Sequence, residues 1–247
     1  MGLRDDILAF RPYNEQEETE KRLMLQYMDT FPDLLTRENE MAHFTASCWI
    51  VNPARTHALM AFHNLYQSWA WLGGHADGEE DLLRVALREA NEESGIVGAR
   101  PLRNDIFSLE ILGVDGHVKR GRYVATHLHL NCTYLLEADD RLPIRVKADE
   151  NSAVRWIPFA DVEAEVREPE MRVVYRKLMD KAGCRTGAES EITPEASCSE
   201  WAALKTAGPP AAPAALSISK RVFRHTGAMR PVGGQIGLLR GGGLSAK

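Results

Sequence analysis

One stretch of this 247-residue chain, residues 74–96, constrains the local structure most strongly. Apolar side chains recur there at helical spacing and form a single stripe, made by Leu82, Leu83, Ala86, Leu87 and Ala90. Asp77 and Glu80 have the spacing of a capping box, which predicts that the helix begins near Gly78. Gly95 stands where a left-handed C-terminal cap is favoured. We therefore expect an amphipathic helix whose apolar stripe packs on the core.

Three glutamates lie off that stripe, at positions 89, 92 and 93. This i, i+3, i+4 spacing gathers the carboxylates of Glu89, Glu92 and Glu93 on one patch of the helix, where they repel one another unless a cation compensates. Carboxylate oxygens are hard ligands that suit Mg²⁺ or Mn²⁺. A solvated acidic face is the alternative explanation for an arbitrary pair of helical glutamates, so the surrounding pattern has to decide.

The surrounding residues fit the pattern G-x5-E-x7-R-E-U-x-E-E-x-G-U, in which U is an aliphatic residue. The matching residues are Gly74, Glu80, Arg88, Glu89, Ala90, Glu92, Glu93, Gly95 and Ile96. This pattern is the Nudix box, and the chain resembles a Nudix hydrolase. The resemblance implies an α+β fold, a Nudix α/β/α sandwich with a mixed sheet, and an enzyme that hydrolyses pyrophosphate bonds.

The resemblance also implies roles for residues of the box. Glu89, Glu92 and Glu93 are expected to bind Mg²⁺ or Mn²⁺, and one of them, or an acid outside the box, is expected to accept a proton from water. Arg88 and Glu80 are expected to orient the carboxylates, since a guanidinium can hold a carboxylate in one rotamer by paired hydrogen bonds.

Two further metal ligands are expected outside the helix. The carbonyl of Gly73 is a candidate to complete the metal shell. Nudix enzymes commonly supply another acid from a loop later in the fold, and here Asp149 and Glu150 are the candidates, with Glu150 preferred. An ordinary solvated turn is the alternative for either residue alone.

Aromatic and histidine side chains near the box are candidates to bind the substrate. We expect His75, His127 and Trp69 to contact it, although a tryptophan in a strand is at least as often a core residue. His127 and His129 alternate with apolar residues along one strand and therefore share a face. A zinc pair is conceivable there, but the sequence shows no third ligand, and a structural or solvent-facing role is favoured.

The remaining pattern predicts the order of elements. A helix is expected over residues 14–37, strands over 43–51, 57–63, 69–74, 106–114, 123–138 and 153–158, and helical structure over 159–181 with a break near Pro169. We accordingly divide the chain into an N-terminal helical arm (1–40), a Nudix hydrolase domain (41–184) and a low-complexity, disordered tail (185–247). The arm could pack on the domain, close a homodimer or cover the substrate pocket.

Charge and cysteine content limit the partners and the compartment. From Thr186 onward the chain has four acidic and seven basic residues, so the formal net charge of −5 becomes −8 for residues 1–185. A catalytic part this acidic favours a small phosphorylated substrate, such as a nucleotide, over long nucleic acid. The four cysteines lack CxxC spacing, which predicts reduced thiols and a cytoplasmic protein, and no apolar run approaches the length of a membrane span.

The expected reaction is the Mg²⁺-dependent hydrolysis of a pyrophosphate bond in a nucleoside diphosphate linked to another group, which gives a nucleoside monophosphate and a phosphorylated product. A catalytically silent Nudix nucleotide sensor is one alternative, which the complete box disfavours. An isopentenyl-diphosphate-isomerase-like enzyme is another, which the lack of a matching cysteine segment around Cys48 disfavours. Nucleoside triphosphates, nucleotide sugars and dinucleotides all remain open as substrates.

Overall fold

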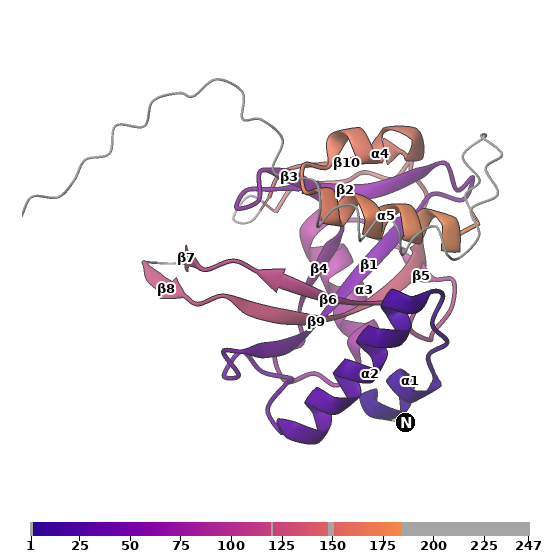
Figure 1. Ribbon diagram of the computed structural model, residues 1–247. Coiled ribbons are helices and arrows are strands. Elements are labelled where there is room, and N and C mark those ends of the chain that lie inside the picture. The colour runs from indigo at the N-terminus through magenta and orange to yellow at the C-terminus, as the bar shows by residue number, and fades with distance from the viewer. Residues whose placement is uncertain (1, 120, 148–150, 184–247) are drawn as a thin grey trace, which may run out of the picture. The chain divides into compact units, whose positions relative to one another are not determined.

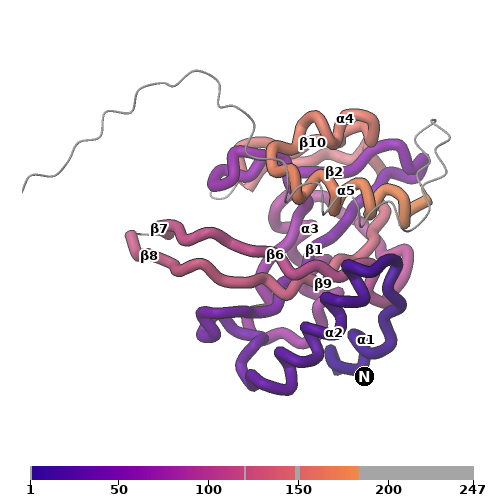
Figure 2. Tube along the Cα trace, in the orientation of Figure 1, coloured from indigo at the N-terminus to yellow at the C-terminus, as the bar shows by residue number. Residues whose placement is uncertain are grey.

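A computed structural model describes residues 2–119, 121–147 and 151–183 (Figures 1 and 2). The expected tail of residues 185–247 and the candidate acids Asp149 and Glu150 lie outside the described residues. No helix in these three ranges has both the length and the apolarity that crossing a bilayer requires. Cys48 and Cys132, which fall within them, are buried free thiols, as expected.

A mixed sheet lies at the centre of the described domain. Its strands are β1 (Ala42–Val51), β2 (His57–His63), β3 (Ser68–Ala70), β4 (Leu72–His75), β5 (Arg100–Pro101), β6 (Ser108–Val114), β9 (His127–Glu137) and β10 (Asn151–Pro158). They follow the order β10-β2-β1-β9-β5, with β3 on β2, β4 on β1 and β6 on β9. The central pair β1–β9 is parallel, and the other pairs are antiparallel. A separate hairpin joins β7 (His117–Lys119) to β8 (Arg122–Val124).

Helices cover both faces of this sheet, which confirms the expected α/β/α sandwich. They are α1 (Leu3–Ala9), α2 (Glu15–Thr30), α3 (Leu82–Ser94), α4 (Phe159–Glu165) and α5 (Pro169–Lys181). Strand β1 shows the division, because successive side chains point to opposite faces. Its residues Phe44, Ala46 and Cys48 belong to a core cluster with α1, α2 and α3, whereas Trp49 and Val51 pack in a second cluster with α4 and α5.

Helix α3 begins about four residues later than the expected start near Gly78. Asp81 is its N-cap, and the Asp81 carboxylate accepts a hydrogen bond of 3.1 Å from a backbone N–H of the first turn. Asp77 cannot serve as the cap, because its backbone has a positive φ of 48° and its carboxylate forms a bidentate pair with Arg37. Gly95 ends the helix in the left-handed conformation, with φ 65°, as its position in the pattern predicts.

The N-terminal arm consists of two helices and a turn instead of the single helix expected over residues 14–37. Helix α2 ends at Thr30, just before Pro32, whose ring disfavours helical backbone at the preceding residue. The chain then turns, and the buried Leu34 accepts a hydrogen bond of 2.7 Å from the N–H of Phe44 at the start of β1. Short α1 was not expected from the sequence.

The arm packs on the domain, the first of the three possibilities raised by its apolar stripe. Helix α2 lies beside β6 (Figure 2) and bonds the backbone groups that this strand leaves unpaired. The amide of Gln16 donates to the carbonyl of Leu109 at 3.0 Å, and the carboxylate of Glu20 accepts from the N–H of Ile111 at 2.9 Å. A covered edge cannot pair with a strand of another chain.

A buried cluster of charges joins α2 and β6 to α5. The ammonium of Lys177 lies 3.2 Å from Glu17 and 3.0 Å from Glu110, and Lys181 lies 2.6 Å from Glu17. Ser108 donates a hydrogen bond to a carboxylate of the cluster. Burial opposes these charges, but the oppositely charged neighbours outweigh it, so the pKa of Glu17 is lowered and that of Lys177 is raised.

Replacing Lys177 by Met should lower the free energy of unfolding by about 3–5 kcal/mol, because Glu110 loses its buried cation. The matched replacement of Arg100, whose side chain is 73% exposed in its pair with Glu137, should cost less than about 1 kcal/mol. Urea denaturation of both variants measures the difference. Equal losses would show that the buried cluster contributes no more than a surface pair.

The stability should also depend on pH through Glu20, because burial raises the pKa of its carboxyl group to about 7 from an ordinary value of 4.5. Between these two values the folded state binds more protons than the unfolded state, so the free energy of unfolding should fall as pH rises, by up to about 3 kcal/mol. Glu20→Gln should remove that loss and be more stable than the wild type at pH above 7. Parallel pH dependences of the two proteins in urea denaturation would contradict this assignment.

Candidate active site

The site is built where the loop at β4 meets helix α3. The N–H of Gly73 donates a hydrogen bond of 2.9 Å to the carboxylate of Glu93. A Cβ on Gly74 would lie 2.6 Å from a carboxylate oxygen of Glu89, and one on Gly73 would lie 2.6 Å from a backbone carbonyl of β1. A side chain at position 73 would therefore clash with the backbone of β1, and one at position 74 would displace the carboxylate of Glu89.

Glu93 is the most enclosed of the three box glutamates, with 5% of its surface exposed. One of its oxygens accepts from Gly73, and the other accepts a hydrogen bond of 3.1 Å from the side-chain amide of Asn151 on β10. Glu93 is therefore a buried acid and not part of a solvated acidic face. A carboxylate offers about four lone-pair positions, so it can accept more than two hydrogen bonds.

Glu89 and Glu92 are progressively more open, with 12% and 48% of their side chains exposed. The pKa of Glu89 is raised, mainly by burial and further by the charge of Glu92. Two cations approach the pair: Arg88 lies 3.3 Å from Glu89, and the ammonium of Lys147 lies 4.0 Å from Glu92.

The structure separates Arg88 from Glu80, both of which were expected to orient the carboxylates of the box. Arg88 bonds Glu89 and is thus placed to orient that carboxylate. Glu80 instead accepts a hydrogen bond of 3.1 Å from the N–H of Leu3, at the start of α1. Within residues 2–119, 121–147 and 151–183, no hydrogen bond or ion pair joins Glu80 to Arg88. Glu80 connects the box to the N-terminal arm.

Trp69, an expected substrate contact, is a core residue. Its ring meets Phe62 edge-on at 5.5 Å between centroids, and the guanidinium of Arg155 covers it at 4.4 Å. It belongs to the core cluster that includes residues of α4 and α5. The alternative of core packing, which is common for tryptophans in strands, therefore describes this residue, and it offers no open ring face to a base.

The two other expected substrate contacts, His75 and His127, lie in a group of histidines. His127 and His129 share a face of β9, with 3.2 Å between their Nε2 atoms. His43, which the sequence reasoning did not select, lies opposite His129 on β1, and its ring centroid is 5.1 Å from that of His75. Further histidines are thus present beside the pair. The sequence signal that could have identified His43 was its position at the start of the strand-forming run of residues 43–51.

The polar face of β9 is buried instead of solvent-facing, because β9 is paired on both edges and covered on both faces. Thr45 and Ser47 on β1 donate to the side-chain oxygen of Asn131 at 3.0 and 2.8 Å. The amide of Asn131 donates in turn to Glu110 and Thr133. These residues form a closed hydrogen-bond network between the histidines and the charge cluster.

Comparison with known proteins agrees with the fold and the box residues described above. The family model of the NUDIX domain matches residues 41–178. An RNA pyrophosphohydrolase of Sphingopyxis alaskensis is 27% identical over 123 residues, which cover 47% of this chain and 77% of that protein.

Solved structures with a similar fold include an Ap4A hydrolase of C. elegans, with a TM-score of 0.42 and 19% identity over 57% of this chain and 94% of the other. The dihydroneopterin triphosphate pyrophosphohydrolase of E. coli gives a TM-score of 0.43 and 15% identity over 56% and 94% of the two chains. The family match spans more than half of the chain and includes the complete box. The chain therefore belongs to the Nudix family of hydrolases, which act on pyrophosphate bonds.

Proposed function

We propose that this enzyme hydrolyses a pyrophosphate bond in a nucleoside diphosphate linked to another group, with Mg²⁺ or Mn²⁺ as cofactor, and releases a nucleoside monophosphate and a phosphorylated product. The observation that carries the proposal is the gathering of Glu89, Glu92 and Glu93 against a glycine loop that has no room for a Cβ. Such a loop lets the backbone lie directly against β1 and the carboxylate of Glu89.

The donor set fits a hard divalent cation. Glu89, Glu92 and Glu93 offer carboxylate oxygens, which Mg²⁺ and Mn²⁺ prefer to nitrogen or sulfur. Burial, and to a lesser extent the charge of Glu92, raises the pKa of Glu89, so a bound cation would favour its charged form. A bound cation would supply charge neutralisation for the phosphoryl oxygens and would activate water. Gly73, whose N–H already bonds Glu93, keeps its carbonyl as a further donor, and Glu150 stays a candidate from outside the described residues.

The chain's own residues then have distinct tasks. Glu93 is held in one position by hydrogen bonds from Gly73 and Asn151, so its orientation is fixed before any ligand arrives. Arg88 holds Glu89. Glu89 is the best candidate to accept a proton from water, because a base works best when its pKa lies closer to the working pH.

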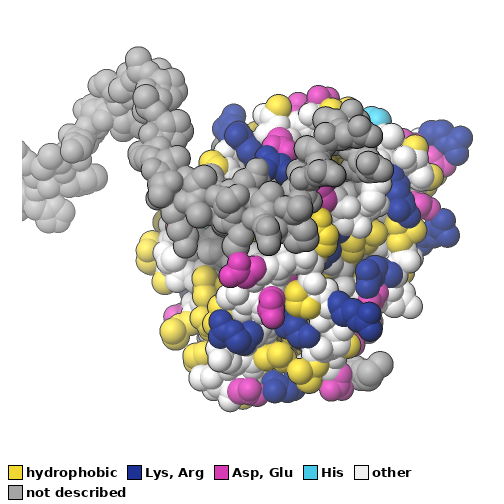
Figure 3. Space-filling view, turned by 45° about the vertical axis from the view of Figure 1, so that its right-hand side comes forward, with side chains coloured by type: hydrophobic (Ala, Val, Ile, Leu, Met, Phe, Trp, Pro, Cys, Tyr) yellow, Lys and Arg dark blue, Asp and Glu magenta, His cyan; other side chains and the backbone are white. Residues whose placement is uncertain are grey.

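A small nucleotide is the preferred substrate class. Acidic and basic side chains are interspersed on the face drawn in Figure 3, and residues 1–185 carry a formal charge of −8. Neither feature attracts a long polyanion. The relative named RNA pyrophosphohydrolase nevertheless makes a short RNA with a 5′ pyrophosphate a necessary member of any substrate panel.

Replacing Glu93 by Gln should reduce Mg²⁺-dependent kcat/KM by at least about 100-fold, because one negative charge leaves the metal site. The fold should survive. The side-chain oxygen of Asn151 is buried and has no hydrogen-bond partner among the described residues, so rotating that amide lets it accept from the new Gln while Gly73 still donates. The melting temperature should therefore stay close to that of the wild type.

Glu79→Gln is the matched control, since Glu79 stands in the same stretch at a position that the box pattern leaves free. Its activity should equal that of the wild type. A Glu93→Gln protein that folds and turns over at the wild-type rate would remove Glu93 from the metal site.

Replacing Gly74 by Ala should lower kcat/KM by at least about tenfold with little loss of stability. The new Cβ meets the end of the Glu89 side chain at 2.6 Å, and that side chain can swing away, which displaces the carboxylate but leaves the core intact. Gly113→Ala on β6 is the control, because nothing lies within 4 Å of a Cβ there. Steady-state kinetics and thermal melts of the two variants make the comparison, and an active Gly74→Ala protein would contradict the role of Glu89.

The reaction itself is tested by chromatographic detection of the monophosphate product over nucleoside triphosphates, nucleotide sugars, dinucleotides and the 5′-pyrophosphate RNA, each with Mg²⁺ and with a chelator. Turnover of one class, lost in the chelator and in Glu93→Gln, supports the proposal. Silence over the whole panel with nucleotide binding retained would assign the protein to the sensors instead.

A further inference from the structure

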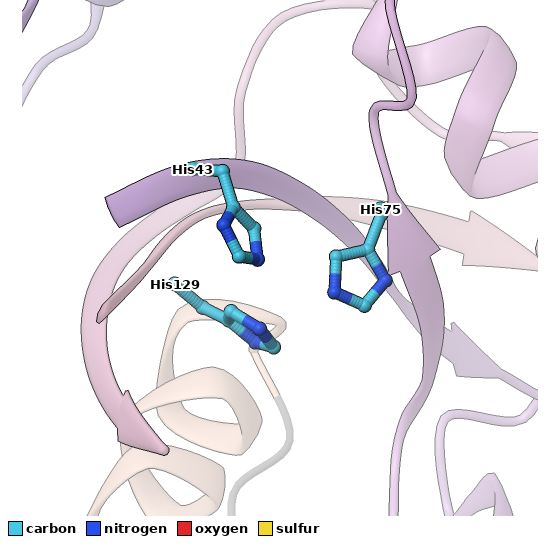
Figure 4. A group of neighbouring side chains, drawn as sticks. All are labelled: His43, His75 and His129. Atoms are coloured by element: carbon cyan, nitrogen blue, oxygen red, sulfur yellow. The ribbon is translucent and has the colours of Figure 1, made fainter. Parts of the chain in front are cut away.

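Three histidines from three strands converge beside the catalytic loop. His43 lies on β1, His75 on β4 and His129 on β9, and their rings point toward one another (Figure 4). One nitrogen from each ring lies within 4.8 Å of the other two. The sheet register produces this meeting, because His43 pairs with His129, and His75 pairs with Thr45, two residues farther along the same face of β1.

The hydrogen bonds of His43 leave one nitrogen free to coordinate a ligand. Its Nδ1 lies 3.0 Å from the backbone carbonyl of Asn39, and since a carbonyl only accepts, Nδ1 carries the proton. The lone pair is therefore on Nε2. That atom is buried and has no hydrogen-bond partner in the described part of the chain. A metal-binding histidine has this arrangement, with the second nitrogen donating to a carbonyl.

His127 fixes the orientation of His129 through a hydrogen bond between their Nε2 atoms. Nδ1 of His127 lies 2.8 Å from the carbonyl of Ala125, so its Nε2 carries a lone pair. That Nε2 lies 3.2 Å from Nε2 of His129, which must then be the donor. The remaining nitrogen of His129, Nδ1, presents its lone pair. His127 thus stands behind the triad as an orienting partner.

The triad is neutral at physiological pH, the state in which imidazole binds metals. Burial lowers the pKa of His75 to about 3 and that of His129 to about 2, and it also lowers the pKa of His43. The nearby charges of Arg37 and Lys119 act in the same direction.

We propose that His43, His75 and His129 bind one transition-metal ion, with Zn²⁺ the best fit, at a site separate from the carboxylates of the box. Imidazole nitrogens suit Zn²⁺ and related ions and are poor ligands for Mg²⁺. Tetrahedral coordination at about 2.0–2.1 Å places nitrogens about 3.4 Å apart, so the rings have to close by about 1 Å on binding. Three protein ligands leave a fourth position for water or a substrate oxygen.

The position of His75 gives the site a consequence for the enzyme. It directly follows Gly73 and Gly74, the glycines that contact Glu93 and Glu89. An ion that joins His75 to β1 and β9 would fix the end of β4 and therefore the loop that faces the carboxylates. The ligands of the two sites share no residue, so each can be emptied by mutation without removing the other.

Titration of chelator-treated protein with Co²⁺ tests the proposal directly, since Co²⁺ replaces Zn²⁺ and absorbs visible light more strongly when four-coordinate than when six-coordinate. We expect one equivalent per chain with a four-coordinate spectrum, displaced by one equivalent of Zn²⁺. His43→Gln, His75→Gln and His129→Gln should each weaken binding by at least about 100-fold, and His127→Gln by about 10- to 100-fold.

Two controls separate this site from the box and from misfolding. His57→Gln on β2 removes a histidine outside the group and should leave the Co²⁺ spectrum unchanged, as should Glu89→Gln. Thermal melts without metal report whether each triad variant folds, and in the wild type Zn²⁺ should raise the melting temperature, an effect absent from the variants. Failure of wild-type protein to bind Co²⁺, or binding that only Glu89→Gln removes, would overturn the proposal while leaving the Mg²⁺ site untouched.

Discussion

The carboxylate of Glu93 connects the parts from which the site is built. A buried charge is tolerated only when hydrogen bonds replace its hydration, and here the donors are the backbone of Gly73 and the side chain of Asn151. These two donors lie 78 residues apart in the sequence, on β4 and β10, so the glutamate cannot be satisfied until the sheet has formed. The geometry of the box is thus a property of the whole domain, although the box itself is one short segment.

The same face of the sheet carries two groups of polar residues, which differ in whether their polar atoms bond one another. Toward α5, the polar atoms bond one another: Asn131 accepts from β1 and donates to Glu110, whose charge Lys177 compensates. Toward the catalytic loop, His43 keeps a buried nitrogen without a hydrogen-bond partner in the part of the chain that the structure describes. Because leaving a buried polar atom unbonded costs on the order of 1–3 kcal/mol, a closed network indicates a structural role and an open one indicates a ligand.

The sequence predicted those features whose cause is local. Runs of β-forming residues located strands β1 and β2, Gly95 marked the end of α3, and the break near Pro169 separated α4 from α5. The prediction failed where the local structure depends on a residue that is distant in the sequence. Asp77 has the right spacing for a helix cap, but Arg37 engages its carboxylate, and the start of α3 moves to Asp81. For the same reason the histidine pair on β9 looked incomplete: its partners come from other strands, and only the register of the sheet reveals them.

The box also depends on the N-terminal arm, which lies before the segment that matches the family model, residues 41–178. Glu80 of the box bonds the N–H of Leu3, and Glu17 of α2 shares Lys177 and Lys181 of α5. Cutting the chain at residue 40 would therefore leave Lys181 without Glu17, Lys177 with Glu110 as its remaining carboxylate, and the β6 edge without its partners from α2. We infer that the arm folds as part of the catalytic domain, since Lys181 has no other carboxylate partner among the described residues.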